Sequence, residues 1–511
     1  MIDSVASKSF TDFRIDLTRL NLFRDYKKEK EMGKLTHLTP KDVFGYFEAL
    51  AALPHGSGNM EKISSFCMDF AKQHGLEAQR DGANNVIIRK PASRGYEGAR
   101  PVILQGHLDM VCQKTEEADI NFEIHGLTIF EDGEYIRAKD TTLGADNGIA
   151  VAMMLAILAD NTLSHPPIEA VFTTDEEIGM VGAKALDCKG LMGKRMINMD
   201  SEDPRTVTVS CAGGSDLTAT LPILRNNKKG QMLSISVKGL RGGHSGVEIH
   251  KGGVNANILM GRILHMLQKK YAFDIISVEG GDKGNAIPVS CTAKLCTEKG
   301  EALLKEAKQY AESLRLEISP REPDVLFETA LSPEGDFAVM EASQKAQLIH
   351  ALLLAPNGVM DMSAEINGLV ETSLNLGVLQ TKPDAVILAF ALRSSKKTAL
   401  VFLEEKLRTF FAQLGFSVQT GGHYPPWEYK PDSEMRQLYM EKYQEKTGNL
   451  PRVEAIHAGL ECGVFADAIE GLDCISIGPE MHGIHTVQEK LSIKGTQMLY
   501  EIVLEMLRSM R

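Results

Sequence analysis

The sequence is short of the features that would place it in several whole classes of protein. No stretch of its 511 residues approaches the roughly 18 consecutive apolar residues that span a bilayer, and its N-terminus lacks the uninterrupted apolar segment of a signal peptide. None of its eight cysteines forms a C-x-x-C pair, the spacing of zinc ribbons and redox sites. We therefore expect a cytoplasmic protein in a reducing compartment, with no membrane partner.

Positive charge is also scarce. Lys and Arg number 56 against 68 for Asp and Glu, a formal net charge of −12, and no long basic stripe offsets it. Nucleic acid is therefore not the expected partner. What is present is a chain that is 43% hydrophobic and 24% charged, average for a soluble globular protein, and long enough for two or three domains.

The first part of the chain alternates strands and helices. We expect helices at residues 42–53 and 61–74, strands at 102–105, 168–173 and 196–199, and a buried crossover helix at 147–159, which is apolar on nearly every face. This alternation predicts an α/β fold with a mostly parallel sheet covered by helices on both sides.

The pattern changes after residue 212, where alternating strands are separated by helices. The expected strands are 217–221, 233–237, 286–295, 369–379 and 385–392, and the expected helices are 256–269, 301–314, 338–354 and 398–414. The alternation of strands and helices seen in the first part of the chain then resumes, with a helix at 433–447, a strand at 474–477 and a terminal helix from about 492. We predict a catalytic domain in two parts, residues 38–212 and 426–511, interrupted by an α+β lid at 213–425.

Residues 1–37, with a charged run before Met32, are interpreted as an N-terminal extension. Met32 is an alternative start of the protein.

Imidazole and carboxylate side chains follow the predicted strands. They are His107, Asp109, Asp175, Glu176, Glu177, Asp200 and His485. In open α/β sheets ligands collect at the carboxyl ends of strands, so these segments would deliver their side chains to one crevice. This donor set suits zinc and its first-row neighbours. Asp109 would share a face with His107 and could hold its second ring nitrogen.

Five of the candidate residues have both a functional and an ordinary interpretation. Asp146, directly before the apolar helix, is either a helix cap or a carboxylate that bridges two metals, and we prefer the bridge. Glu176 and Glu177 could divide the work of metal ligand and proton carrier, or form a solvated acidic turn, and the sequence does not say which glutamate does which. His244 among glycines and Arg393 after a strand are loop and surface residues, or an oxyanion donor and a carboxylate clamp.

Several motifs make the chain resemble the aminoacyl-histidine dipeptidases of the dinuclear zinc exopeptidases, from about residue 38 to the end. The motifs are residues 105–111 (QGHLDMV), 141–148 (TTLGADNG), 242–246 (GGHSG) and 456–463 (IHAGLECG). The resemblance implies hydrolysis of Xaa-His and other dipeptides with two divalent metal ions, with Zn²⁺ expected and Mn²⁺ or Co²⁺ as alternatives. It also implies a homodimer joined through the lid.

The resemblance further implies a role for each matching position. His107 and Asp200 would bind one metal, and Glu177 and His485 would bind the other. Asp146 would bridge both metals, and the peptide bond from Asp146 to Asn147 would be cis. Glu176 would be the general base and Asp109 would support the first histidine. The remaining implied contacts are the lid histidine His244 and the substrate-binding positions Asn285, Arg393 and Gly459.

The chain departs from the family pattern at the last ligand. His485 opens the run HTVQE instead of the usual HSPDE, and His482 lies only three residues away as a competitor. The same metal core also serves N-acyl amino acid amidohydrolases and tripeptidases. A noncatalytic metal- or peptide-binding protein is the alternative from another class.

Overall fold

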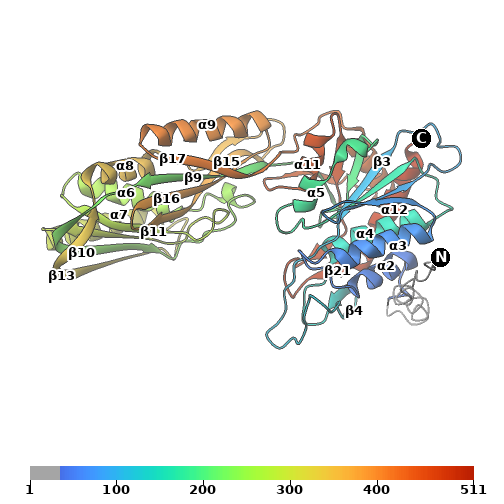
Figure 1. Ribbon diagram of the computed structural model, residues 1–511, viewed down its shortest axis with the longest axis horizontal. Coiled ribbons are helices and arrows are strands. Elements are labelled where there is room, and N and C mark those ends of the chain that lie inside the picture. The colour runs from blue at the N-terminus through green and yellow to red at the C-terminus, as the bar shows by residue number, and fades with distance from the viewer. Residues whose placement is uncertain (1–34) are drawn as a thin grey trace, which may run out of the picture.

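The computed structural model describes residues 35–511. They form two bodies side by side, which join through a narrow region of strands and loops (Figure 1). The N-terminal extension and Met32 lie almost wholly outside the described residues, but Leu35 is already fully buried against the first body.

The first sheet, as we name it, has eight strands within residues 35–511, in the order β1-β2-β6-β3-β7-β19-β8-β18. β3 pairs parallel with both β6 and β7, β19 pairs parallel with β7, and β18 pairs parallel with β8. Its strands are β1 (Glu77–Arg80), β2 (Val86–Lys90), β3 (Val102–His107), β6 (Ile168–Thr173), β7 (Arg195–Asn198), β8 (Thr206–Cys211), β18 (Arg452–Ile456) and β19 (Asp473–Ser476). The predicted mostly parallel sheet is confirmed.

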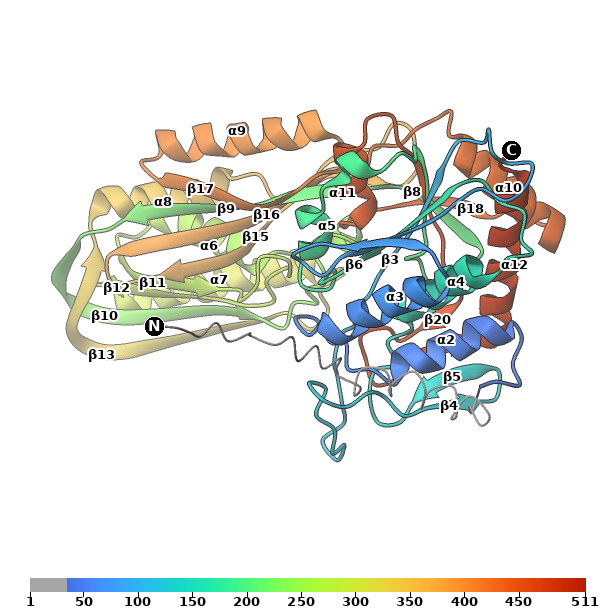
Figure 2. The same ribbon diagram turned by 45° about the vertical axis from the view of Figure 1, so that its right-hand side comes forward.

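Helices cover both faces of the first sheet (Figure 2). One face carries α2 (Lys41–Ala51), α3 (Glu61–Gln73), α4 (Ala145–Ala159), α10 (Glu434–Thr447) and α12 (Ile493–Ser509), and the other carries α5 (Val181–Ala185) and α11 (Glu461–Ala468). Every residue of α4 from Asn147 to Leu158 is buried, because the helix lies between the sheet and α2. The predicted buried crossover helix is confirmed.

A small sheet flanks this body. It contains β4 (Ile129–Asp132), β5 (Tyr135–Ala138), β20 (Met481–His482) and β21 (Lys490–Ser492).

The second sheet is antiparallel and has nine strands within the described residues. Its strands are β9 (Gly213–Pro222), β10 (Arg225–Lys238), β11 (Asp274–Gly280), β12 (Cys291–Thr297), β13 (Leu326–Met340), β14 (Gly358–Met362), β15 (Val370–Thr381), β16 (Ala385–Ser394) and β17 (Ser417–Tyr424). Four helices share one apolar core with it, namely α6 (Ala256–Gln268), α7 (Gly300–Ile318), α8 (Ala342–Leu354) and α9 (Lys397–Gln413). This is the inserted α+β domain that the sequence predicts.

Several predicted elements in this domain have wrong boundaries; the strand expected at 233–237, for example, is the longer β10. The strand expected at 286–295 starts only at Cys291, because residues 286–290 form a loop that packs beside residues 242–246. The helix expected at 338–354 starts at Ala342, because residues 338–340 end the long strand β13. β13 itself was not predicted: its side chains are mostly exposed or half-buried, so an apolar alternation is missing from its sequence.

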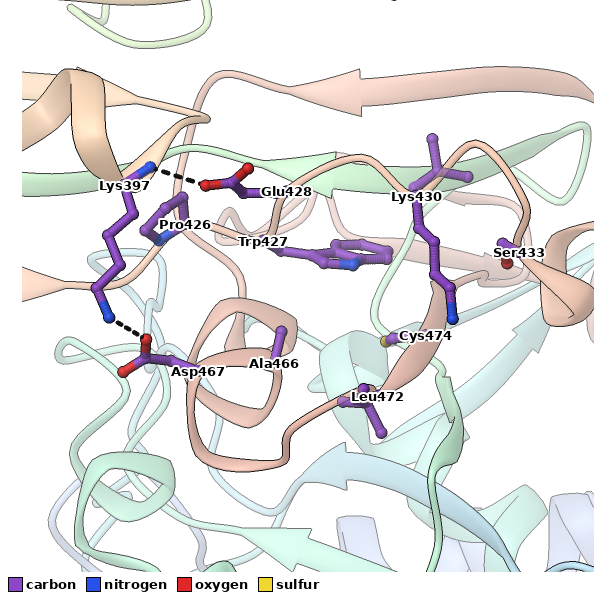
Figure 3. Close-up of a pocket in the computed structure, with 12 residues that line it drawn as sticks. Lys397, Pro426, Trp427, Glu428, Lys430, Ser433, Ala466, Asp467, Leu472 and Cys474 are labelled. Atoms are coloured by element: carbon purple, nitrogen blue, oxygen red, sulfur yellow. Dashed lines mark hydrogen bonds and ion pairs between the residues drawn. The ribbon is translucent and has the colours of Figure 1, made fainter.

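The two bodies meet at a cavity of about 300 Å³ lined by the N-terminus of α9, by residues 426–430 and by α11 (Figure 3). Lys397 of α9 spans it: its backbone N–H donates to Glu428 at 3.0 Å, and its ammonium group lies 2.5 Å from Asp467 of α11. The Trp427 ring lies across the cavity. Both bodies therefore contribute to this junction.

Among the helices of residues 35–511, none combines the length and the apolar character needed to cross a bilayer.

Candidate active site

The carboxyl ends of β3, β6 and β7 lie side by side at one edge of the first sheet. β3 and β6 are parallel, with His107 opposite Thr173, so the acidic segment after β6 begins beside His107. That segment folds back as a tight turn, in which the backbone N–H groups of Gly179 and Met180 both donate to the carbonyl of Glu176 at 2.8 Å. Asp200 follows β7, the other neighbour of β3. Separate segments thus converge as predicted from strand-end positions.

Asp146 lies at the centre of the cluster, between two histidines. Its Oδ1 is 3.2 Å from Nε2 of His107, and its Oδ2 is 3.2 Å from Nε2 of His485. Each histidine also faces a second carboxylate: Nε2 of His107 is 3.4 Å from Oδ1 of Asp200, and Nε2 of His485 is 2.8 Å from Oε1 of Glu177. The arrangement is two imidazole–carboxylate pairs that share one central carboxylate.

Asp146 is not a helix cap. The residue at the cap position of α4 is Gly144, and Asp146 itself has non-helical backbone angles inside the first turn. A cis peptide bond joins Asp146 to Asn147, as the resemblance implies. The Asn147 side chain donates to Asp200 at 3.0 Å and to the carbonyl of Met199 at 2.8 Å, which ties the turn to the end of β7. The side chain of Asp146 is thereby free to face both histidines.

Asp109 contacts both His107 and the backbone of the acidic turn after β6. Nδ1 of His107 lies 3.0 Å from the backbone carbonyl of Asp109 and 3.4 Å from its Oδ1, so the ring donates through Nδ1 and turns Nε2 toward Asp146. The same carboxylate accepts hydrogen bonds from the backbone N–H groups of Glu176 at 3.0 Å and Glu177 at 3.2 Å. Asp109 therefore orients both the histidine and the acidic turn.

The geometry separates the two adjacent glutamates. The carboxylate of Glu177 is paired with His485, whereas that of Glu176 makes no hydrogen bond with any residue from 35 to 511. Burial raises the pKa of Glu176 to about 9, and the negative charges of Asp200 and Glu461 add to this effect. One glutamate is thus paired with a histidine of the cluster, and the other is a half-buried carboxyl group beside it.

His482 lies away from the cluster. Its Nε2 contacts Glu480 at 3.0 Å, and its ring packs against Tyr135. Of the two competing histidines, His485 is the one that faces Asp146.

Comparisons with known proteins show the family to which the chain belongs. The model of peptidase family M20/M25/M40 matches residues 103–509, about four fifths of the chain. The cytosol non-specific dipeptidase of Escherichia coli (strain K12) is 34% identical over 481 residues, which are 93% of this chain and 99% of that protein. The chain belongs to peptidase family M20/M25/M40. As a member of this family it is a metal-dependent hydrolase that acts on peptide bonds.

Solved structures resemble this family member over nearly their whole length. The crystal structure of aminoacylhistidine dipeptidase from Vibrio alginolyticus is 34% identical, with a TM-score of 0.88, and the match covers 95% of this chain and 99% of that one. The aminopeptidase PepT from Bacillus cereus ATCC 10987 is 16% identical, with a TM-score of 0.55 over 93% of this chain and 99% of that one, and it shares the fold.

The cluster of this peptidase is chemically suited to cations. Ligand atoms of His107, Asp146 and Glu177 all lie within 4.8 Å of one another. Burial raises the pKa of Asp200 to about 7, and the nearby negative charges of Asp146 and Glu177 act in the same direction. Burial acts to lower the pKa of His107, but the surrounding carboxylates outweigh it and raise that pKa well above its ordinary value. Crowded carboxylates that compete for protons, with two imidazoles among them, are donors that suit a divalent metal ion.

The site residues predicted in the lid form a second group, around Arg393 at the end of β16. Ser245, next to His244, donates its backbone N–H to the carbonyl of Asn285 at 2.8 Å. A Cβ atom added to Gly246 would lie 2.9 Å from Cε1 of His244 and 3.1 Å from Nε of Arg393, so these two side chains flank Gly246. Nη1 of Arg393 donates to the Tyr424 hydroxyl at 2.8 Å.

Gly459 joins this second group from the first body. A Cβ atom at Gly459 would lie 2.8 Å from the Tyr424 ring, so the close approach requires glycine. Within residues 35–511, no hydrogen bond or ion pair connects this group to the carboxylates around Asp146. The structure therefore brings the eleven predicted site residues together as two groups, one around Asp146 and one around Arg393.

Two buried glutamates of the site were not assigned a role from the sequence. Glu461, fully buried at the start of α11, accepts hydrogen bonds from Gln105 at 2.5 Å and Thr173 at 2.7 Å, while its Oε1 has no partner in the described residues. Glu489 accepts four backbone N–H groups of residues 143–146 at 2.7 to 3.4 Å. The sequence offered one signal for each residue. Glu461 is the acidic residue of the IHAGLECG motif, and Glu489 follows His485 by four residues.

Proposed function

We propose that this peptidase hydrolyses dipeptides, using two divalent metal ions held around Asp146. The observation that carries the proposal is the position of the Asp146 carboxylate, whose two oxygens each face a different histidine at 3.2 Å. A carboxylate so placed can be shared by two cations.

The remaining ligands divide between the two ions. His107 and Asp200 would hold one ion, and His485 and Glu177 the other, because these are the pairs that face opposite oxygens of Asp146. Such ions, when bound, lower the pKa of water and polarise the scissile carbonyl. Zn²⁺ is the proposed metal, and Mn²⁺ and Co²⁺ suit the same donors.

Glu176 is the proposed general base. Its carboxyl group is half-buried beside the cluster, and it makes no hydrogen bond within the described residues. Its backbone is fixed by the hydrogen bond to Asp109, so it can accept the proton of the attacking water and deliver it to the leaving amine. Cations in the cluster would offset the negative charges of Asp200 and Glu461 that raise its pKa, and so leave it ionised for this task.

The group around Arg393 is proposed to bind substrate from the lid. Arg393 would hold the C-terminal carboxylate, a task suited to a guanidinium group, and His244 would stabilise the oxyanion that develops at the scissile carbonyl. Asn285 and the backbone at Gly459 would provide further contacts. We propose that the catalytic domain comprises residues 38–212 and 426–511 and that the lid comprises residues 213–425. This division follows the two sheets, because the strands of the first sheet lie in the former ranges and those of the second sheet lie in the latter.

The dipeptide substrate is supported by the names of two relatives, a cytosol non-specific dipeptidase and an aminoacylhistidine dipeptidase. Xaa-His and other dipeptides are the substrates we propose. A cytoplasmic location agrees with the first of those names and with eight cysteines that are all free.

We also propose a homodimer joined through the lid. β14 pairs with β15 on one side, and no strand from residues 35–511 covers its other edge. An open strand edge can pair with a second copy of the chain. Sedimentation equilibrium of the purified protein tests this proposal, and a monomer at micromolar concentration would contradict it.

The function is tested with protein freed of metal by chelation and reloaded with Zn²⁺, Mn²⁺ or Co²⁺. We expect two ions per chain and cleavage of β-Ala-His and Leu-Gly, with little action on Leu-Gly-Gly or acetyl-leucine. Faster cleavage of Leu-Gly-Gly would indicate a tripeptidase, and faster cleavage of acetyl-leucine an amidohydrolase. Two bound ions without any hydrolysis would indicate a noncatalytic binding protein.

A further inference from the structure

A cavity of about 760 Å³ opens directly beside the metal-ligand candidate Glu177. Three segments line it, namely residues 56–59, 110–114 and 120–123, and it closes on Glu177 and Ile178. This volume is within the usual range of small-molecule sites and is ample for one large side chain. The cavity therefore adjoins the place where the peptide bond would be cleaved.

Hydrogen bonds fix the walls of this cavity in advance. The Asn59 side chain donates to the carbonyl of Glu123 at 3.1 Å, and Nζ of Lys114 donates to the carbonyl of Ile120 at 2.9 Å. On the opposite wall, the backbone N–H of Met110 donates to the carbonyl of His55 at 3.2 Å. The loop that contains residues 120–123 is thus tied to both of the other segments, and the pocket is already formed.

The lining of the cavity is mixed and contains an apolar part. Met110, Val111, Ile120, Phe122 and Ile178 form this part, and the polar side chains of Ser57, Asn59, Lys114, Asn121, Glu123 and Glu177 complete the lining. Ile178 is 60% exposed although it directly follows Glu177. A large apolar side chain left open to solvent next to a catalytic cluster indicates a surface that an apolar group of the substrate covers.

The turn after β6 separates this cavity from the group around Arg393. Ile178 lies on the cavity side of the turn. Met180 lies on the other side, where its Cε is 3.2 Å from the position of a Cβ atom on Gly459, next to Tyr424. Because Tyr424 is the hydrogen-bond partner of Arg393, the proposed clamp for the C-terminal carboxylate and the cavity are on opposite sides of this turn.

We propose that this cavity, named the N-side pocket, receives the side chain of the N-terminal residue of the dipeptide and favours large apolar residues. The inference rests on the proposed function, because it requires that Arg393 holds the other end of the substrate. The N-side pocket would then make Leu-, Met- and Phe-initiated dipeptides better substrates than glycine-initiated ones.

The test compares kcat/KM for Leu-Gly, Gly-Leu and Gly-Gly in the metal-loaded protein. Ile178→Ser changes an exposed side chain, so folding is not at risk, and Phe122→Ala provides a second truncation. We expect each to lower the ratio of kcat/KM for Leu-Gly to kcat/KM for Gly-Gly by about 10- to 100-fold, the range for lost apolar contacts in a pocket. Ile124→Ser is the matched control, because Ile124 is 59% exposed in the same loop but does not line the pocket.

Two results would overturn the N-side pocket. One is an unchanged ratio of Leu-Gly to Gly-Gly in both variants. The other is a selective loss of Gly-Leu cleavage, which would assign the cavity to the C-terminal residue. A wild-type protein that cleaves none of the three dipeptides would instead refute the proposed function, so the two failures are distinguishable.

Discussion

The buried carboxylate of Glu489 holds the backbone of Asp146. Its Oε1 accepts the N–H of Asp146 at 3.4 Å and that of Ala145 at 2.9 Å, while its Oε2 accepts the N–H groups of Leu143 and Gly144 at 2.7 and 3.1 Å. Glu489 follows His485 by four residues. One short segment therefore places the His485 ring against the Asp146 side chain and also fixes the backbone of the loop that contains Asp146.

Glu489→Gln should therefore weaken both the fold and the metal centre. The new amide would turn an NH₂ group toward backbone donors, and donors left unsatisfied in a buried site cost about 1–3 kcal/mol of unfolding free energy. Loss of such a supporting contact typically lowers metal affinity by about 10- to 100-fold. Urea denaturation and metal content after dialysis measure the two effects. Glu505→Gln, an exposed change in α12, is the control, and equal metal retention in both variants would contradict the prediction.

Glu176→Gln and Glu177→Gln should fail in different ways. The first removes the proposed proton carrier, so kcat should fall by about 100- to 10,000-fold while two metal ions stay bound. The second removes the partner of His485, so metal content itself should fall. Elemental analysis beside single-turnover rates separates the two. Near-normal turnover of Glu176→Gln would refute its role as the base.

Metal-free protein should lose stability as the pH rises from about 7 to about 9, because the pKa values of Glu176, about 9, and His485, about 10, are both raised in the folded chain. The folded state then keeps protons that the unfolded chain has released, so a higher pH favours unfolding. A proton kept on Glu176 lowers the unfolding free energy by ~1.4 kcal/mol per pH unit, and one kept on His485 lowers it by less, because that side chain is 43% exposed and solvent screens its ion pairs.

Metal ions should remove this dependence, since they take the place of those protons. Urea denaturation of chelator-treated and metal-loaded protein at the two pH values gives the comparison, and metal-free Glu176→Gln should show a shallower slope. Metal-free protein that becomes more stable toward pH 9 would contradict the sign.

Arg393→Lys should raise KM selectively for substrates with a free C-terminal carboxylate. A lysine cannot reproduce the two parallel hydrogen bonds of a guanidinium group, and hydrogen bonds to a charged group are worth about 1.5–3 kcal/mol, or roughly 10- to 100-fold in binding. Leu-Gly and its C-terminal amide are the substrates to compare. If the variant raises KM equally for both, Arg393 does not bind the carboxylate.

The sequence alone predicted four of the eight strands of the first sheet, β3, β6, β7 and β19, and it grouped several residues of the cluster around Asp146. Apolar runs at β3, β6 and β7 predicted buried parallel strands, and polar residues directly after such strands must meet at one sheet edge, which is why His107, Glu177 and Asp200 could be grouped. The uniformly apolar residues of α4 likewise had to be buried. The strand β13 escaped prediction because its side chains face solvent and carry no apolar alternation.

Only the tertiary structure decided which of several similar side chains does what. Glu176 and Glu177 are adjacent and identical in sequence terms, and the distance to His485 distinguishes them. His482 and His485 are distinguished by which one the loop turns toward Asp146. Distances between segments more than 300 residues apart depend on packing and on backbone turns, and neither hydrophobic periodicity nor motif spacing encodes them.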